Sequence, residues 1–336
     1  MPGADVPDAI VVVGGGSWGQ AFASLAAGRG ARTRLVCRTA AQAARLRDTR
    51  RDHRYLPGRV LPDAVEVTHL DADGQLDGAD VAVLAVPSRA TADTIAWLTP
   101  RVAAGTGLLS LTKGLDPATG RRLSETWGAA LPGCPFAVLT GPNHAEEVAA
   151  GQPAAAVVAG DEGLCRSVQA VLNGPRFRVY LNGDLLGVEL AAAAKNVIAV
   201  AAGMSDGMGF GDNAKASLIT RGLAEMTRLG VACGAQEATY RGLAGMGDLI
   251  ATCTSRHSRN RMAGELLVEG LAASEVEGRL GQVAEGLPTV RNLLRLAGRA
   301  GVELPISEQV AAAAFDGRPA AACLEALMNR APAVEE

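Results

Sequence analysis

The feature that most constrains the fold is a glycine-rich turn that follows an apolar run near the start of the chain. The run Ile10–Val13 leads into Gly14-Gly15-Gly16-Ser17-Trp18-Gly19, which fits the pattern GxGxxG, and a helical stretch follows to Gly28. In such a strand–turn–helix unit the glycines allow a tight turn, approach of a pyrophosphate to the backbone and close packing of helix on strand. The free N–H groups at the helix start then face the phosphates. The sequence therefore predicts a dinucleotide site here; a junction of strand, turn and helix without a ligand is the alternative.

The pattern of apolar runs predicts two domains of different class. In the first half, short apolar runs alternate with helical stretches, as in a parallel sheet covered by helices on both faces. From about Asp184, a plausible helix cap, only helical stretches follow, at 184–203, 214–230, 259–269 and 289–300. We therefore expect an α/β chain with an N-terminal Rossmann-type doubly wound parallel sheet (8–185) and a C-terminal all-α domain (186–332). The expected strands are Ile10–Val13, Thr33–Cys37, Val81–Val86, Leu108–Leu111, Phe136–Leu139 and Ala155–Val158.

Charge and cysteine usage narrow the class of protein. The net charge is −3, which gives no reason to expect nucleic-acid or membrane-surface binding. Six cysteines without a CxxC pair, and an N-terminus without a signal core, predict reduced thiols and a cytoplasmic protein without a metal. The apolar run Val188–Met204 carries Glu189 and Lys195, so it is expected to be a buried helix and not a membrane span.

The basic residues are unusually biased. Of 32 Lys and Arg residues only Lys113, Lys195 and Lys215 are lysine, which makes each a candidate for a site that requires a compact ammonium. Lys195 stands alone in an apolar helix, where desolvation would lower its pKa toward that of a general base. The four histidines, in loops or polar stretches, offer no comparable base. Asp248, in a glycine loop that opens a helical stretch, could orient the Lys195 ammonium, or it could be a helix cap.

Two further clusters suggest how anions would bind. The second predicted strand ends in Arg38, without the acidic residue that usually accepts from the ribose 2′-hydroxyl of NAD, which favours NADPH over NADH. Ser258-Arg259-Asn260 begins a helix and combines a hydroxyl, a guanidinium and an amide, as a cradle for a substrate phosphate would. An ordinary serine cap beside surface arginines is the alternative for the second cluster.

Ten ordered motifs between about residues 10 and 330 resemble the bacterial NAD(P)-dependent glycerol-3-phosphate dehydrogenase family. The N-terminal half contributes Gly14–Gly19, Leu111-Thr112-Lys113-Gly114-Leu115 and Leu139-Thr140-Gly141-Pro142-Asn143. The C-terminal half contributes Ala194-Lys195-Asn196-Val197, Gly203-Met204-Ser205-Asp206-Gly207, Ile219–Arg228, Gly247-Asp248-Leu249, Thr252-Cys253-Thr254, Ser258-Arg259-Asn260 and Val283-Ala284-Glu285-Gly286.

The resemblance implies hydride transfer between NAD(P)H and dihydroxyacetone phosphate, giving sn-glycerol 3-phosphate for glycerophospholipid synthesis, at a site between the two domains. It implies Lys195 as proton acceptor, with Asp248 and Lys113 as further catalytic residues. The substrate-binding residues that it implies are Lys113, Gly141, Asn143, Lys195, Asp248, Ser258, Arg259 and Asn260. The cofactor-binding residues are Gly14, Gly16, Ser17, Trp18, Gly19, Arg38, Lys113, Ala145, Arg259, Val283 and Glu285.

Two positions depart from the family pattern, and other properties stay open. Some members have Thr-Phe where this chain has Asn143-His144, and Lys215 falls where the family often has arginine. The sequence leaves the oligomeric state open, a homodimer included, together with the direction of the reaction. Two other interpretations compete. One is another dehydrogenase with a helical second domain, such as a β-hydroxyacid or a nucleotide-sugar enzyme, and for the nucleotide-sugar enzyme Cys253 would be the one candidate nucleophile. The other is a non-catalytic NAD(P) sensor. A sensor would not need Lys195, Asp248 and the phosphate cradle together.

Overall fold

The computed structural model describes residues 7–330, and they divide into two compact units. The Rossmann unit comprises the described residues up to Asp116 together with Arg121–Val188. The helical unit comprises the described residues from Glu189 onward together with the short segment Pro117–Gly120. The end predicted for the second domain, residue 332, lies outside the described residues.

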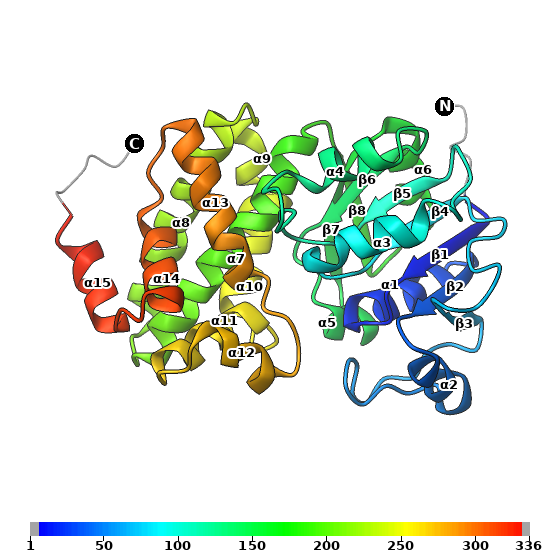
Figure 1. Ribbon diagram of the computed structural model, residues 1–336, viewed down its shortest axis with the longest axis horizontal. Coiled ribbons are helices and arrows are strands. Elements are labelled where there is room, and N and C mark those ends of the chain that lie inside the picture. The colour runs from blue at the N-terminus through cyan, green and yellow to red at the C-terminus, as the bar shows by residue number, and fades with distance from the viewer. Residues whose placement is uncertain (1–6, 331–336) are drawn as a thin grey trace. The chain divides into compact units, whose positions relative to one another are not determined.

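The Rossmann unit is built on one sheet of eight strands (Figure 1). Its order is β3-β2-β1-β4-β5-β6-β7-β8, and all neighbours are parallel except β6 and β7, which are antiparallel. The order reverses between β1 and β4, which is the switch point where ligands of doubly wound sheets bind. The strands are β1 (Ala9–Val13), β2 (Arg32–Cys37), β3 (Val65–His69), β4 (Val81–Leu84), β5 (Gly107–Ser110), β6 (Phe136–Thr140), β7 (Ala154–Gly160) and β8 (Phe177–Asn182).

Both faces of this sheet are buried, which explains the continuous apolar runs of the central strands. In β1, Ile10 and Val12 pack into one hydrophobic cluster, whereas Val11 and Val13 pack into another on the opposite face. Side chains such as Phe22 complete the first cluster and Trp127 the second. The helices of this unit are α1 (Ser17–Ala27), α2 (Ala40–Thr49), α3 (Thr91–Leu98), α4 (Leu123–Ala130), α5 (Ala145–Ala149) and α6 (Glu162–Leu172), with a 3-10 turn at Ser88–Ala90. The expected fold class, a doubly wound sheet followed by helices, is confirmed.

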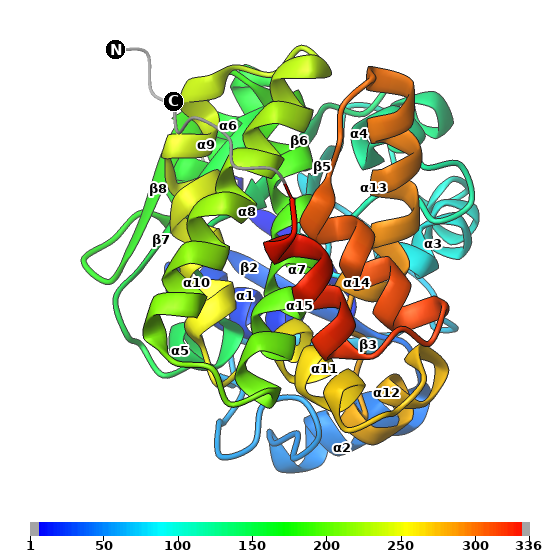
Figure 2. The same cartoon turned by 90° about the vertical axis from the view of Figure 1, so that its left-hand side faces the viewer.

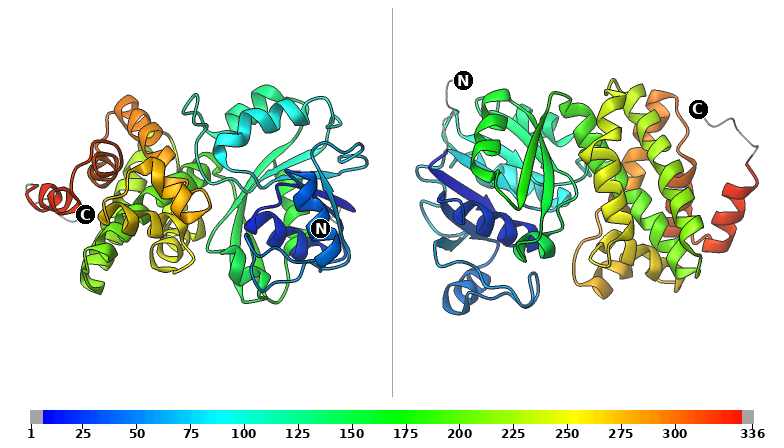
Figure 3. Two further views of the ribbon diagram at one scale, coloured as in Figure 1. Left: turned by 60° about the horizontal axis from the view of Figure 1, so that its bottom comes forward. Right: turned by 180° about the vertical axis from the view of Figure 1, so that it is seen from behind.

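The helical unit is organised around one long apolar helix, α7 (Leu185–Gly207) (Figure 2). By length and composition α7 could cross a membrane, but 83% of its most apolar stretch is buried inside the protein, which is typical of a core helix. The other helices are α8 (Asp212–Ala232), α9 (Glu237–Arg241), α10 (Asp248–Thr254), α11 (Arg259–Val268), α12 (Ala273–Leu280), α13 (Gly286–Ala300), α14 (Pro305–Phe315) and α15 (Ala320–Met328), with a π-helical turn at Leu243–Gly247 (Figure 3).

The sequence patterns missed the two outermost strands, and burial explains why. Residues of β8 alternate between buried and exposed, with Phe177 and Val179 inside and Arg178 and Tyr180 outside. β3 at the other edge likewise carries Glu66 between two buried valines. An edge strand is covered less completely than a central one, so it lacks the unbroken apolar run by which the six expected strands were identified. The short helices α9, α12, α14 and α15 were also not expected.

A buried carboxylate holds the start of α14. Glu225 of α8 accepts hydrogen bonds from the backbone N–H groups of Ile306 (2.8 Å) and Ser307 (3.0 Å) and from the Ser307 hydroxyl (2.6 Å). Glu225 thus satisfies donors that a helix N-terminus leaves without an intrahelical partner. Desolvation by burial nevertheless raises the pKa of Glu225 above its usual value.

We expect Glu225→Gln to lower the free energy of unfolding by about 1–3 kcal/mol at low pH. The amide nitrogen carries two donors and no acceptor, whereas both oxygens of the carboxyl can accept from the Ile306 and Ser307 N–H groups even when it is protonated. Since the raised pKa favours the protonated carboxyl in the folded state, wild-type stability contributed by this group is full below pH 4.5 and is lost as the pH rises through the folded-state pKa. The stability difference between wild type and variant should therefore shrink from pH 4.5 upward in denaturant titrations. A difference that stays constant with pH would show that Glu225 has no raised pKa.

Candidate active site

The glycine-rich turn connects β1 to α1 at the switch point of the sheet. Gly14 has φ +119°, and a Cβ there would lie 2.4 Å from the carbonyl oxygen of Ala85. A Cβ on Gly19 would lie 1.9 Å from the carbonyl oxygen of Gly14, so the helix and the turn approach as closely as backbone permits. A Cβ on Gly16, in contrast, would meet nothing within 4 Å. The turn therefore needs Gly14 and Gly19 for its own structure, while Gly16 borders open space that a pyrophosphate can enter.

Trp18 and Ala145 come together on the adjoining helix surface. They pack with Ala21 and Leu56 in one small hydrophobic cluster, which joins α1 to α5. The Trp18 ring also meets the Phe22 ring edge to face, with centroids 6.4 Å apart. Its buried indole Nε1 has no hydrogen-bond partner among the described residues. Two residues predicted to bind the cofactor thus share one surface beside the glycine turn.

Four more predicted residues follow the carboxyl ends of parallel strands in the same unit. Arg38 follows β2 and is exposed. Lys113 follows β5, and its ammonium donates to the Gly141 carbonyl (3.3 Å) and to Asn143 Oδ1 (3.2 Å). The segment that holds Gly141 and Asn143 follows β6. Since these strand ends share one edge of the sheet, the residues belong to the edge at which ligands of this fold bind.

Asn143 presents a buried donor beside the Lys113 ammonium. Its side chain is 5% exposed, and its Nδ2 has no hydrogen-bond partner among the residues that the structure describes. Buried polar groups are nearly always satisfied, so this amide is suited to an oxygen atom of a ligand. The asparagine that departs from part of the family thus still offers a polar contact.

In the helical unit, Lys195 lies in a buried polar cluster. Its side chain is 3% exposed, and the ammonium donates to Asp248 Oδ1 (2.5 Å) and to Thr252 Oγ1 (2.7 Å). The Thr252 hydroxyl donates in turn to the Asp248 carbonyl one helical turn back (2.6 Å), which leaves its oxygen lone pair facing Lys195. Asp248 does orient Lys195, and its carboxylate favours the ammonium form against the desolvation expected from burial alone. Thr252 belongs to the motif Thr252-Cys253-Thr254, but the sequence alone did not indicate a role for it.

The backbone before Asp248 is a π-helical turn, Leu243–Gly247. The Gly247 N–H donates to the Gly242 carbonyl (3.1 Å), five residues earlier. A Cβ on Gly245 would lie 2.2 Å from the Tyr240 carbonyl oxygen, so only glycine fits within this wider turn. Single π turns are frequent at functional sites, and this one fixes the position from which Asp248 reaches Lys195.

Helix α11 begins at Ser258, Arg259 and Asn260, as expected. The three side chains differ in how free they are to bind an anion. Ser258 Oγ caps the helix by accepting from the Arg261 N–H (3.2 Å), and Arg259 is exposed. The Asn260 side chain is engaged in the fold: it donates to Asn196 Oδ1 (2.8 Å) and accepts from the Gly286 N–H (2.9 Å). Arg259 is therefore the most available anion-binding group of the three.

Asn260 links, by hydrogen bonds, the segment that contains Lys195 to the residues predicted to bind the cofactor. Its partner Asn196 follows Lys195, while its partner Gly286 begins α13 directly after Glu285. Arg259 also donates to Gln282 (3.2 Å), next to Val283. The third lysine, Lys215, instead pairs with Asp206 (2.8 Å), which also binds Arg261.

Cys253, the remaining candidate nucleophile, is buried. Burial raises the pKa of the Cys253 thiol to about 12, which removes the one candidate for a thiolate nucleophile. The sequence predicted that all four histidines lie in loops or polar stretches. The structure differs for His69, which is the last residue of strand β3.

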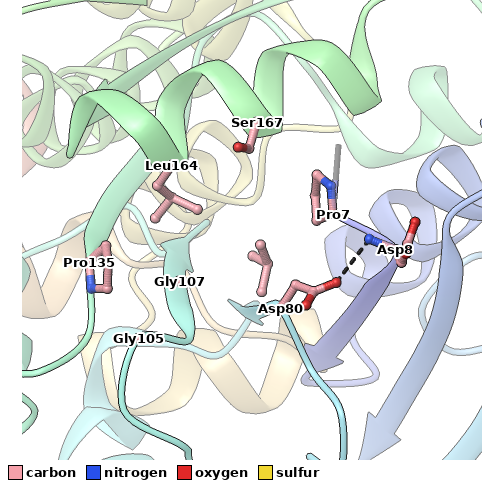
Figure 4. A pocket seen from close by; sticks show the side chains of 9 residues that line it. Pro7, Asp8, Asp80, Gly105, Gly107, Pro135, Leu164 and Ser167 are labelled. Atoms are coloured by element: carbon pink, nitrogen blue, oxygen red, sulfur yellow. Dashed lines mark hydrogen bonds between the residues drawn. The ribbon is translucent and has the colours of Figure 1, made fainter. Parts of the chain in front are cut away.

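A hollow at the opposite edge of the sheet contains none of the predicted residues (Figure 4). It lies where β4 and β5 begin, and it is lined by residues such as Asp80, Gly107 and Leu164. The Asp80 carboxylate accepts from the Asp8 and Ala9 N–H groups, both at 2.9 Å, and so serves the fold.

Comparison with known proteins agrees over nearly the whole chain. The family models of the N-terminus and C-terminus of NAD-dependent glycerol-3-phosphate dehydrogenase match residues 9–164 and 184–325. The chain is 50% identical to glycerol-3-phosphate dehydrogenase [NAD(P)+] of Thermus thermophilus, over 97% of this chain and 99% of the relative. It is 46% identical to the Streptomyces coelicolor protein of the same name, over 96% and 97%. The crystal structure of glycerol-3-phosphate dehydrogenase from Coxiella burnetii superposes with a TM-score of 0.91 at 36% identity, covering 96% of this chain and 99% of that one.

The open space at Gly16 leads to a direct test of the glycine turn. Gly16→Leu should fold normally but weaken cofactor binding by about 10- to 100-fold, because the side chain would fill space that the ligand needs. Gly19→Ala should instead lower the melting temperature, since its Cβ would collide with backbone. Cofactor titration and thermal unfolding of both variants measure this contrast. Unchanged cofactor affinity in Gly16→Leu would contradict the assignment of the turn.

Proposed function

The chain belongs to the NAD-dependent glycerol-3-phosphate dehydrogenase family, and from that premise we propose that it reversibly reduces dihydroxyacetone phosphate to sn-glycerol 3-phosphate with NAD(P)H. The observation that carries the proposal is the buried Lys195 ammonium, held by Asp248 and Thr252 in a helical core. A protein that only senses NAD(P) has no need of a buried, oriented proton donor. We further propose that the product enters glycerophospholipid synthesis, that the enzyme is cytoplasmic and that it acts as a homodimer.

The residues of the Rossmann unit fit a dinucleotide. Gly16 borders open space at the start of α1, where backbone N–H groups and the helix dipole favour a pyrophosphate. We assign Gly14, Gly16, Ser17, Trp18 and Gly19 to the turn that would hold it, and Arg38 to the ribose end. Lys113, Ala145, Arg259, Val283 and Glu285 complete the proposed set. When bound, the reduced cofactor supplies the hydride for the carbonyl carbon of the substrate.

The protein's part in the reaction is to hold and move one proton and to stabilise charge. In the reducing direction the Lys195 ammonium gives a proton to the carbonyl oxygen of dihydroxyacetone phosphate, and in the oxidising direction the same nitrogen takes it from the C2 hydroxyl. Asp248 keeps the nitrogen in place through both directions, because its carboxylate is itself buried and hydrogen-bonded. Thr252 fixes a second direction of the ammonium.

The substrate phosphate is assigned to the start of α11. Arg259 is exposed and supplies the charge, while the Ser258 hydroxyl can still donate although its oxygen caps the helix. Asn260 contributes mainly by tying this helix start to Asn196 and Gly286. We assign Gly141, Asn143 and Lys113 to the part of the same substrate that does not carry the phosphate.

The proton-transfer assignment is tested by initial rates of NADPH oxidation with dihydroxyacetone phosphate. Lys195→Ala should lower kcat by about 10²- to 10⁴-fold, the range for a lost acid–base group, with little change in NADPH affinity. Thr252→Val, which removes no charge, should give a smaller loss. Lys215→Ala is the matched control, since it breaks another lysine–aspartate pair of the same unit and should leave kcat nearly unchanged. Wild-type inactivity toward this substrate would refute the proposed reaction, and near-normal turnover of folded Lys195→Ala would refute the role of Lys195.

Cofactor choice is the second test. We expect NADPH to be favoured over NADH but not exclusively, because Arg38 is exposed and solvent screens its charge. Arg38→Ala should raise the KM for NADPH by roughly 3- to 10-fold and leave that for NADH nearly alone. Arg38→Asp should invert the preference by adding repulsion against the 2′-phosphate and an acceptor for the ribose hydroxyl. The ratio of kcat/KM for the two cofactors measures both effects, and a ratio that does not move would exclude Arg38 from reading the 2′ position.

A further inference from the structure

Two glutamine side chains hold the same carbonyl group of the glycine turn. The Gly15 carbonyl oxygen accepts from Gln20 Nε2 (2.8 Å) and from Gln42 Nε2 (2.7 Å). Gln20 belongs to α1 and Gln42 to α2, so the two donors reach the turn from different helices. Both are buried, so the carbonyl has exchanged water for two fixed amides.

Asp52 fixes both glutamines at once. Its Oδ2 accepts from Gln20 Nε2 and from Gln42 Nε2, at 3.1 Å each. Its Oδ1 accepts from the backbone N–H groups of Arg54 (3.0 Å) and Tyr55 (3.3 Å). The side chain is 4% exposed. An acceptor shared by two amides orients both, so that their N–H groups point to Gly15 and their oxygens do not.

The peptide geometry passes this orientation on to the ligand side of the turn. The Gly15 C=O and the Gly16 N–H belong to one trans peptide plane, in which they point in opposite directions. Holding the carbonyl therefore directs the Gly16 N–H away from the glutamines. Gly16 is the residue whose Cβ would meet only open space.

The packing around Gly15 and Tyr55 supports a clamp of this kind. A Cβ on Gly15 would lie 2.9 Å from Cys37 Sγ and 3.0 Å from Gln42 Nε2, so the Cys37 thiol and the Gln42 amide together leave little room for a side chain at this position. The turn that Asp52 begins is tied to α1 a second time, because the Ser17 hydroxyl donates to the Tyr55 carbonyl (2.6 Å).

We infer that Asp52, acting through Gln20 and Gln42, is a positioning residue that presets the Gly16 N–H toward the cofactor pyrophosphate. The inference rests on the proposed function of the glycine turn. This positioning role is separate from proton transfer and from recognition of the ribose 2′ position. Removal of the Asp52 carboxylate should therefore weaken the binding of every ligand that contains the pyrophosphate, whatever the rest of that ligand is.

The test compares Asp52→Asn with wild type by equilibrium titration with NADPH and with NADH. The new amide would direct a donor at the glutamines or at the Arg54 and Tyr55 N–H groups, so we expect both dissociation constants to rise about tenfold, the size of one lost buried hydrogen bond. The ratio of the two constants should stay the same. The affinity for adenosine 2′-monophosphate, which lacks the pyrophosphate, and kcat at saturating NADPH should change less than about twofold.

Two further variants keep the inference testable if Asp52→Asn does not fold. Gln20→Ala and Gln42→Ala each leave one amide on Gly15, so each should weaken both cofactors by a few-fold and the pair by more than either alone. Gln169→Ala is the matched control: it removes a glutamine that donates to the Val179 carbonyl (2.8 Å) in the same unit, and it should leave cofactor affinity unchanged.

The outcomes separate this inference from the proposed function. If wild type binds neither cofactor, the assignment of the glycine turn is wrong. If wild type binds and the folded variants bind equally well, the positioning role is wrong although the turn is correctly assigned. An equal loss for adenosine 2′-monophosphate, or a changed ratio of NADPH to NADH, would also overturn it, because the network would then serve the adenosine end or the unit as a whole.

Discussion

The buried pair between Lys195 and Asp248 is the constraint around which the polar centre of the helical unit is arranged. Both side chains are almost fully buried, so the desolvation cost is large and the pair is tolerable only with good geometry and further hydrogen bonds. Thr252 supplies such a bond, and α7 supplies the apolar surroundings. Hydrophobic residues of similar size could fill the same volume at no loss of stability. A charged pair kept in this core is therefore better explained by chemistry than by folding.

The constraint in the Rossmann unit is a different one: the backbone N–H donors of the glycine turn must be held in fixed directions. Gly14 and Gly19 shape the turn, and the Asp52 network holds the carbonyl that faces inward. Lys113 and Asn143 are similarly positioned by contacts with one another at the ends of neighbouring strands. In both units, then, hydrogen bonds from neighbouring side chains fix the position of a polar group.

Sequence reasoning reached most of the fold and the chemically distinctive part of the site. The central strands, the glycine turn and α7 carry strong local patterns, and Lys195 stands out because it is a charge within an apolar run. The edge strands β3 and β8 were missed because partial exposure gives them a mixed pattern. Gln20, Gln42 and Asp52 could not have been connected, since each is an ordinary polar residue until the fold brings α1, α2 and a loop together. Likewise, the pattern at Ser258–Asn260 could not reveal that Asn260 is engaged by Asn196 and Gly286.

The π turn before Asp248 has a consequence for how this part of the site can change. In an α-helix each residue advances the direction of the side chains by about 100°, so one residue more or fewer redirects everything that follows. Leu243–Gly247 places one additional residue within a turn, and Asp248 takes its direction from that count. The direction of the Asp248 side chain thus depends on the number of residues in the π turn and not on the identity of a neighbouring side chain. Apart from Gly245, where a Cβ would collide with backbone, positions in this segment can be substituted without redirecting the carboxylate as long as the count is kept. A single-residue deletion would instead turn the carboxylate away from Lys195 while leaving both side chains of the pair intact.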